Sequence, residues 1–226
     1  SHSINDGSVG GGESDVPQDT FCRACDKGSS DDDVRQMFNL AAVYNLPFGA
    51  GQKYLSQPGT GRSLLGGLQL SAIGTAQTGL PVNITIDRTN ASVPGDFAIS
   101  GWMRPDYVAG VSLTPAGGST PNEWINTLAF AKPAFQTFGN LGRNAFRAPG
   151  ISQLDLGLSK YVGITERVSL RLRADLFNVF NRAQYGAPNA DVSNPANFGV
   201  VTTTISNYAT GRGTPRELQL SAKILF

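Results

Sequence analysis

Few residues of this chain have side chains that could carry out chemistry. Cys22 and Cys25 lie close together within FCRAC. Such a pair fits a local disulfide in an oxidised, extracytoplasmic loop, two free thiols, or a redox or metal site. A thioredoxin-type motif would need a neighbouring βαβ pattern, and zinc would need two further ligands. The only histidine, His2, lies in a polar, glycine-rich start that looks like a tag remnant, a linker or a cut within a longer chain. We therefore expect the disulfide.

Hydrolytic chemistry has little support in the sequence. No G-x-S-x-G motif occurs, and with His2 as the only histidine a Ser-His-Asp or Cys-His arrangement lacks its base. Two loop carboxylates could still serve glycoside hydrolysis; the candidates are Asp87, Asp96, Asp106 and Glu123. Acids in loops are usually solvated. We expect the same of the acidic run Asp31–Asp33, because it lacks the Gly and Glu that a full calcium-binding loop needs. We expect no enzyme, no cofactor and no metal.

Aromatic side chains of the same loop are the remaining binding candidates. Trp102, Tyr107 and Trp124 could stack on a sugar or another flat ligand. Aromatic residues in loops more often anchor the loop to the rest of the protein. Both interpretations stay open at this stage.

The most regular stretch of the chain is ERVSLRLRADLFNVFN, residues 166–181. Leucine, valine and alanine alternate with charged and hydroxyl side chains, which is the period of a β-strand with one apolar and one polar face. Only 15% of the residues are charged, and glycine and proline are plentiful, as expected for an all-β protein with many turns. The net charge of +1 gives no field that would attract nucleic acid.

The same alternation recurs along the chain. We predict spanning strands at 35–46, 67–78, 152–162, 166–180 and 215–226, with a hairpin between the third and the fourth. Residues 1–33 are predicted to be a flexible loop or linker, and 34–226 a partial β-barrel. The links 46–67 and 162–166 are shorter than 78–152 and 180–215, and the region 87–150 is expected to be surface loop rather than core. Short turns at one end and long loops at the other are typical of an outer-membrane barrel.

These stretches resemble a known family. The segments RQMFNLAAVYNLPFG, GNLGRNAFRAPG, DLGLSKY, ITERVSLRLRADLFNVFN and PRELQLSAKILF are similar to the C-terminal part of TonB-dependent outer-membrane transporters. The group that they resemble most is the acidobacterial type with a carboxypeptidase-regulatory-like N-terminal domain. The resemblance covers roughly residues 33–226. The family's plug, its energy-coupling box and most of its strands have no counterpart in these residues.

The resemblance implies an all-β fold of antiparallel strands derived from an outer-membrane β-barrel, with long outer loops. In such a barrel Asp155, Arg171, Arg173 and Asp175 would face the lumen and pair with one another or with the plug. Leu170, Leu172 and Leu176 would face lipid, and Phe226 would be the signal read by the outer-membrane assembly machinery. The partners would be outer-membrane lipid, the rest of the barrel and its plug, and a nutrient ligand.

The implied function is uptake of a large nutrient, such as an oligosaccharide or metal chelate, across the outer membrane of a Gram-negative bacterium. The alternative is a self-associating surface or filament protein, because a sheet with two unpaired edges tends to pair with copies of itself. A hydrolase that uses loop carboxylates is the least favoured hypothesis.

Overall fold

The computed structural model describes residues 2–6, 18–19, 21–87, 102–206 and 213–226. Within these residues the regular secondary structure is mostly antiparallel sheet with almost no helix, which confirms the all-β fold class. The contacts divide the chain into two compact units. We call them the sheet unit (Met37–Ala76, Ile151–Gln184, Ile205–Phe226) and the loop unit (Ser1–Gln36, Gln77–Gly150, Tyr185–Thr204).

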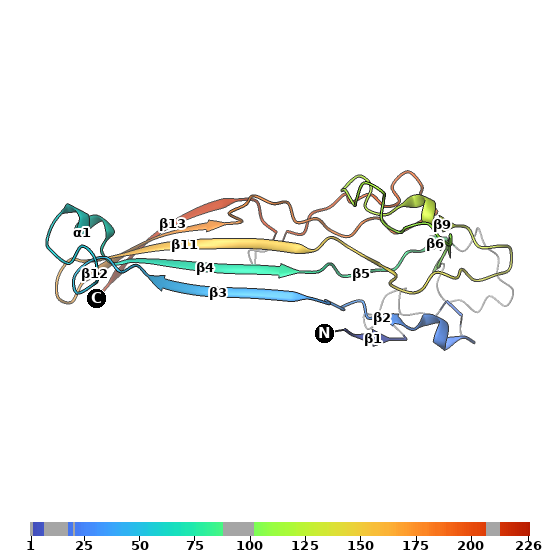
Figure 1. Cartoon of the computed structure of the whole chain (residues 1–226), viewed down its shortest axis with the longest axis horizontal. Helices are drawn as coiled ribbons and strands as arrows, with labels where there is room; N and C mark the ends of the chain where they lie inside the picture. Colours follow the sequence, from blue (N-terminus) through green and yellow to red (C-terminus); the bar gives the residue numbers. More distant parts are fainter. Residues whose placement is uncertain (1, 7–17, 20, 88–101, 207–212) are drawn as a thin grey trace. The chain divides into compact units, whose positions relative to one another are not determined.

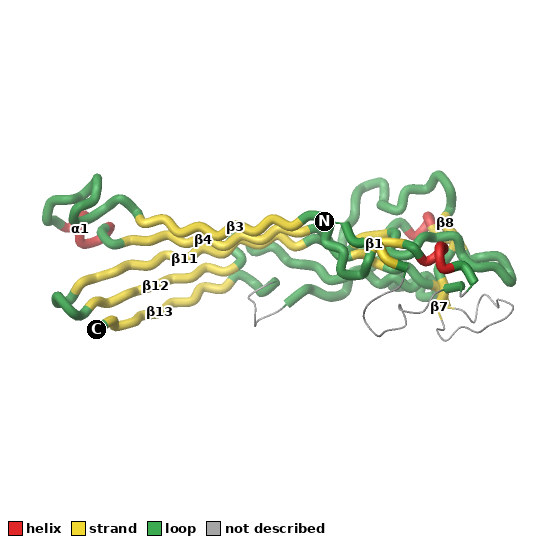
Figure 2. The backbone as a smooth tube through the Cα atoms, turned by 90° about the horizontal axis from the view of Figure 1, so that it is seen from below, coloured by secondary structure: helices red, strands yellow, loops and turns green. Residues whose placement is uncertain are grey.

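The sheet unit is built from five long strands that lie side by side (Figures 1 and 2). They are β3 (Met37–Asn45), β4 (Leu68–Gln77), β11 (Ile151–Gly163), β12 (Ser169–Phe177) and β13 (Glu217–Leu225), in the spatial order β13-β12-β11-β4-β3. They correspond to the five stretches that the alternating pattern predicts. In the described residues β3 and β13 each have a single neighbour, so both edges of the sheet are open.

The register keeps side chains of one kind on one face. Leu156, Leu176 and Leu218 are paired across β11, β12 and β13, and so are Val162, Leu170 and Ile224. Because side chains alternate along a strand, these even-numbered positions form one face of the sheet and the odd-numbered positions form the other. We call them the apolar face and the polar face. The apolar face is strongly exposed: Leu220, for example, is 73% accessible.

One end of the sheet carries the short connections. The pairing of Gly163 with Ser169 and of Ser169 with Leu225 places the 164–168 turn and the C-terminal end of β13 together. The helix α1 (Thr60–Leu65) also lies at this end (Figure 1), which we call the turn end. Lys160 is the one charged residue of β11 on the apolar face, and its Nζ donates to the carbonyl oxygens of Ser63 and Leu64 at 2.7 and 2.6 Å. Its charge therefore sits against the last turn of α1.

The opposite end of the sheet is organised around Asn178, which is 2% exposed and has a φ of 47°. Its Nδ2 donates to the carbonyls of Arg182 and Thr214 at 3.0 and 2.9 Å, and its Oδ1 accepts from the Arg182 amide at 3.1 Å. Asparagine adopts a positive φ more easily than most residues. This residue therefore ends β12 and connects two chain segments.

In its described residues the loop unit contains only short elements. Four two-stranded sheets pair β1 (Ile4–Asn5) with β2 (Gly28–Ser29), β5 (Pro81–Val82) with β10 (Phe146–Arg147), β6 (Ile86–Asp87) with β7 (Trp102–Met103), and β8 (Asp106–Tyr107) with β9 (Phe130–Ala131). Among the described residues it also contains two 3₁₀ helices, η2 (Arg23–Asp26) and η4 (Thr127–Ala129). Within the described residues no helix is long and apolar enough to cross a membrane.

The buried hydrophobic core lies in the loop unit, which corrects the expectation that residues 87–150 are surface loop rather than core. Of the buried hydrophobic residues in the described ranges, all but Ile151 belong to this unit. The main cluster is formed by Val82, Ile84, Ile125, Ala129, Phe130, Leu141, Phe146 and Phe198. Strands of two residues are too short to display a period, so the pattern of the sequence does not reveal this core.

Gly157 leaves room for an ion pair on the polar face, and this can be tested. A Cβ at position 157 would lie 2.5 Å from the Ser71 Oγ and 2.6 Å from an Asp175 carboxylate oxygen. We expect Gly157→Ala to lower the free energy of unfolding by about 1–3 kcal/mol through overpacking, as measured by urea unfolding followed by circular dichroism. Gly163→Ala is the matched control, since a Cβ there meets nothing within 4 Å. An equal effect of both variants would contradict this account.

Candidate functional site: the polar face and the loop unit

The polar face of β12 carries a tight ion pair between Arg173 and Asp175. The Arg173 Nε lies 2.8 and 2.7 Å from the two carboxylate oxygens, and Nη2 lies 2.7 Å from Oδ1. Both side chains are partly exposed. Contacts from two nitrogen atoms of one guanidinium fix the orientation of the pair as well as its distance. Of the four charges expected to face a lumen, these two pair with each other.

The other two expected charges have different neighbours. Asp155 accepts hydrogen bonds from the Gln153 Nε2 at 2.9 Å and from the Asn178 amide at 2.8 Å. The Arg171 guanidinium carbon lies 5.4 Å from the centre of the Tyr161 ring, which is a cation–π distance. Arg171 stands directly opposite Lys223 of β13, a residue that the sequence reasoning did not single out. That all four charges face a lumen stays a prediction.

Phe226 follows β13 and is fully exposed. Its even number gives it the phase of the apolar positions of β13, such as Leu220 and Ile224. An exposed terminal aromatic in that phase is compatible with a recognition signal, and this role also stays a prediction.

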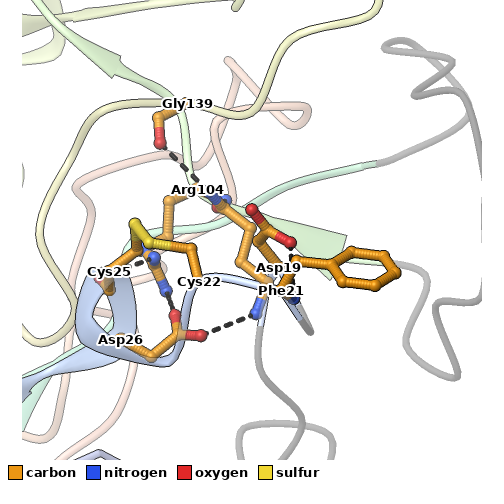
Figure 3. The surroundings of a disulfide bond; sticks show 8 residues. Asp19, Phe21, Cys22, Cys25, Asp26, Arg104 and Gly139 are labelled. Atoms are coloured by element: carbon orange, nitrogen blue, oxygen red, sulfur yellow. Dashed lines mark hydrogen bonds and ion pairs between the residues drawn. A yellow bond between two sulfur atoms is a disulfide. The ribbon is translucent and has the colours of Figure 1, made fainter.

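In the loop unit the structure joins Cys22 and Cys25 in a disulfide (Figure 3), the first of the alternatives that the sequence leaves open. Asp26 follows directly, and its Oδ1 lies 2.6 Å from Nη1 of Arg104. The two side chains are 3% and 6% exposed. The Arg104 Nη2 also donates to the Cys25 carbonyl at 3.2 Å, and its Nε to the Leu141 carbonyl at 2.8 Å. The disulfide turn therefore rests on a buried ion pair.

Two further arginines hold the N-terminal segment. Arg143 donates from its Nε to the Asp26 carbonyl at 2.9 Å, and its Nη1 lies 3.5 Å from Asp31. Arg147 donates from Nη1 to the carbonyl of Asp33 at 2.8 Å and pairs through Nη2 with its carboxylate. Together with Arg104, these arginines of the 102–150 segment are the polar residues that fix this unit. Arginine and aspartate far apart in sequence give no local signal, so the sequence reasoning missed them.

Asp33 corrects the expectation that the acidic run is a solvated loop. The residue is 2% exposed. The amide of Ser3 donates to its Oδ1 at 2.9 Å, and this hydrogen bond together with the Arg147 guanidinium holds the pKa of Asp33 well below its usual range. A carboxylate with such partners is stable when buried, because its charge is neutralised and its oxygen atoms accept hydrogen bonds. Asp33 is thus a structural anchor.

The aromatic candidates are placed as follows. Trp124 packs against the hydrophobic core, and its Nε1 donates to the Arg147 carbonyl at 3.0 Å, so it anchors the loop. The Tyr107 hydroxyl donates to the Val111 carbonyl at 2.7 Å. Its ring borders a shallow hollow of about 420 Å³, which is also lined by Leu113, Asn140 and Leu141. The side chain of Trp102 lies outside the described part of the structure.

The described loop carboxylates have these surroundings: the Asp87 amide donates to the Ser193 hydroxyl at 2.6 Å. Asp106 accepts from the Asn140 amide at 2.9 Å, and Glu123 is exposed in a turn in which its amide and carbonyl bond to Thr120. Asp96 lies outside the described residues. No group of three or more His, Cys, Asp or Glu side chains in the described ranges could hold a metal ion. The expectation that the chain is not an enzyme stays a prediction.

The buried pair of Asp26 and Arg104 gives a testable prediction. In Asp26→Ala the Arg104 guanidinium would stay buried without its counter-charge, which costs about 3–5 kcal/mol. We expect the amides of η2 to lose that much protection, as measured by native-state hydrogen exchange with mass spectrometry. Arg23→Ala is the control, because its pair with Asp6 is largely exposed, with the Arg23 side chain 82% accessible. Unchanged protection of η2 in Asp26→Ala would show that the pair does not hold this turn.

Comparison with known proteins relates the two units to one family. A family model described as "Outer membrane beta barrel domain" matches residues 1–219, which include parts of both units. Neither the curated proteins nor the solved structures gave a match. The match extends beyond the sheet into the segment that the arginines hold.

Proposed function

Because the chain belongs to the family of outer membrane beta-barrel domains, and so lies in the outer membrane of a Gram-negative bacterium, we propose that it forms part of the wall and the loops of a barrel that takes up a large nutrient. The receptor would be of the TonB-dependent type, whose C-terminal part the sequence resembles. The energy-coupling elements and the plug of that family would be supplied outside these residues.

The observation that carries the proposal is the register of β11, β12 and β13. Every even-numbered position of β12 and β13 is leucine, isoleucine or alanine, and the odd-numbered positions hold the charges. A leucine side chain that contacts lipid instead of water gains about 1.5–3 kcal/mol, so such a wide exposed apolar surface fits a bilayer rather than water. The polar face would then line the interior of the barrel.

Lys160, the exception on the apolar face of β11, supports the same placement. It lies at the turn end of the strand, and its ammonium group reaches the carbonyl groups at the end of α1. Lysines near a membrane boundary commonly extend their charge toward the polar interface in this manner. The turn end would thus lie at the boundary of the bilayer, with Phe226 beside it as the proposed assembly signal.

The open edges favour a second candidate function. β3 and β13 each have one neighbour among the described strands, and even a small membrane barrel needs about 8 strands. The wall would be closed by further strands of the same polypeptide in a transporter, or by copies of this chain in a self-associating surface protein. The particle mass of the detergent-solubilised protein separates the two: a transporter gives one polypeptide per barrel, whereas self-association gives several.

The membrane placement can be tested by introducing an arginine at either of two adjacent residues of β13 that lie on opposite faces of the sheet. Leu220→Arg places a charge on the apolar face near the middle of the strand, which costs about 2–4 kcal/mol in a bilayer. We expect less folded protein in the outer membrane, measured by heat-modifiable electrophoresis. Gln219→Arg is the matched control, because this residue lies opposite Asp175 on the polar face and should be tolerated. Equal tolerance of both variants would refute the membrane placement.

The transport role needs its own experiment. Cells that express the complete gene product should accumulate at least one member of a panel of fluorescent oligosaccharides and radiolabelled ferric chelates. We expect deletion of the gene or addition of a protonophore to abolish that accumulation. Accumulation of every probe at the same rate with and without the gene would contradict uptake of these nutrient classes and leave self-association as the preferred function.

A further inference from the structure

The connection 46–67 is tied to the apolar side of the sheet at the turn end. Lys160 occupies an even-numbered position of β11, so its side chain leaves the sheet on the apolar side. Its Nζ donates to the carbonyls of Ser63 and Leu64 at 2.7 and 2.6 Å, and to that of Gly66 at 3.3 Å. A helix leaves its last carbonyl groups without an internal partner. Lys160 therefore satisfies the carbonyl end of α1 and holds it against the apolar face.

α1 and its neighbour Leu55 carry exposed apolar side chains. Leu64 and Leu65 are 66% and 43% exposed. Leu55 packs over the helix, since a Cβ on Gly61 would lie 3.3 Å from one of its methyl carbons, and it is itself 41% exposed. Exposed leucines on a short helix are unfavourable in water. Beside a face that contacts the bilayer, the same side chains fit a lipid environment.

The apolar face next to α1 contains a hollow of about 530 Å³. The even-numbered positions of β12 and β13 are leucine or isoleucine except for two alanines, Ala174 and Ala222. Because Ala174 pairs with Leu220 and Ala222 pairs with Leu172, the two small side chains are diagonal neighbours. The hollow is lined by both alanines and by Leu158, Lys160, Leu172 and Leu220. Lys160 thus borders the hollow and contacts α1 at the same time.

The connection that contains α1 is positively charged. Lys53 and Arg62 are its charged residues, and residues 46–67 include no Asp or Glu. The Arg62 Nη1 donates to the Ser56 carbonyl at 3.2 Å. In the described part of the chain neither cation makes an ion pair with a carboxylate. Cations at a membrane surface attract anionic lipid headgroups, so the charge of this connection complements a phosphate group.

From these observations we propose that the apolar face binds one anionic glycerophospholipid at the turn end. An acyl chain fills the hollow over Ala174 and Ala222, and the phosphate group lies against Arg62 of α1. The inference rests on the proposed function, which places this face in the bilayer. Short connections belong to the periplasmic end of an outer-membrane barrel, and the periplasmic leaflet of that membrane consists of phospholipid.

Recognition of the headgroup is tested by native mass spectrometry of the complete gene product, purified in detergent. We expect one bound phosphatidylglycerol, held about tenfold more tightly than phosphatidylcholine with the same acyl chains. Arg62→Gln should weaken phosphatidylglycerol binding about fivefold and leave phosphatidylcholine binding nearly unchanged. Arg167→Gln is the matched control, because Arg167 is exposed in the 164–168 turn at the same end of the sheet. Equal affinity for both lipids, or equal effects of the two variants, would overturn the inference.

Occupancy of the hollow needs a second pair of variants. Ala174→Leu and Ala222→Leu fill it with the side chain that neighbouring positions carry. We expect each to lower the affinity for both lipids about tenfold, because roughly two methylene groups of the acyl chain lose their contacts. Ala42→Leu is the control, since this residue of β3 shares the even-numbered phase but does not line the hollow.

The outcomes separate this inference from the proposed function. If the variants fold in the outer membrane, by heat-modifiable electrophoresis, but neither alanine substitution alters lipid binding, the lipid site is wrong while the barrel placement stands. Tighter binding of lipopolysaccharide than of phosphatidylglycerol also contradicts the inference. Failure of the Leu220 and Gln219 comparison would instead refute the placement on which the inference depends.

Discussion

The pairing register of β11, β12 and β13 is the constraint on which the sheet unit depends. Because side chains alternate with a period of two, a slip by one residue would move Leu170, Leu172 and Leu176 to the face of the charges. The arginines would then enter the apolar surface, and the Arg173–Asp175 pair would lose the space that Gly157 provides. Hydrophobic pattern, ion pair and glycine therefore all specify the same register. Both faces acquire their chemical character from it.

The loop unit obtains its stability in a different manner. Its described strands are too short to form a large sheet, and it combines two hydrophobic clusters with buried arginine–aspartate contacts. Buried ion pairs contribute little compared with apolar packing, but a charge left unpaired is strongly unfavourable. Arg104, Arg143 and Arg147 consequently make alternative positions of the 18–33 segment costly. These three arginines therefore favour one arrangement of loops that have little regular secondary structure of their own.

The sequence predicts the strands of the sheet unit because alternation of apolar and polar residues is visible within each strand. Five strands follow from alternation alone, and the 152–180 hairpin follows from a short turn between two alternating stretches. The ion pairs of the loop unit cannot be predicted from a local pattern, because Asp26 and Arg104 are 78 residues apart and Asp33 and Arg147 are 114 apart. An acidic run looks solvated until its distant partner is known. Asn178 has a weak signal, as asparagine tolerates a positive φ and two of its hydrogen bonds are to the nearby Arg182, but its bond to the Thr214 carbonyl depends on a segment that only the fold brings near.

The two faces and the two open edges together favour closure of the sheet over an open assembly. In a closed barrel and in an open assembly alike, the free backbone groups of β3 and β13 must pair with other strands. In a closed barrel all apolar positions meet lipid, and the polar positions share one interior. In an open filament the same apolar face would need a second sheet to cover it. Closure pairs the edges and places the apolar face against lipid with one geometry, and it makes the charged residues of the polar face part of the interior.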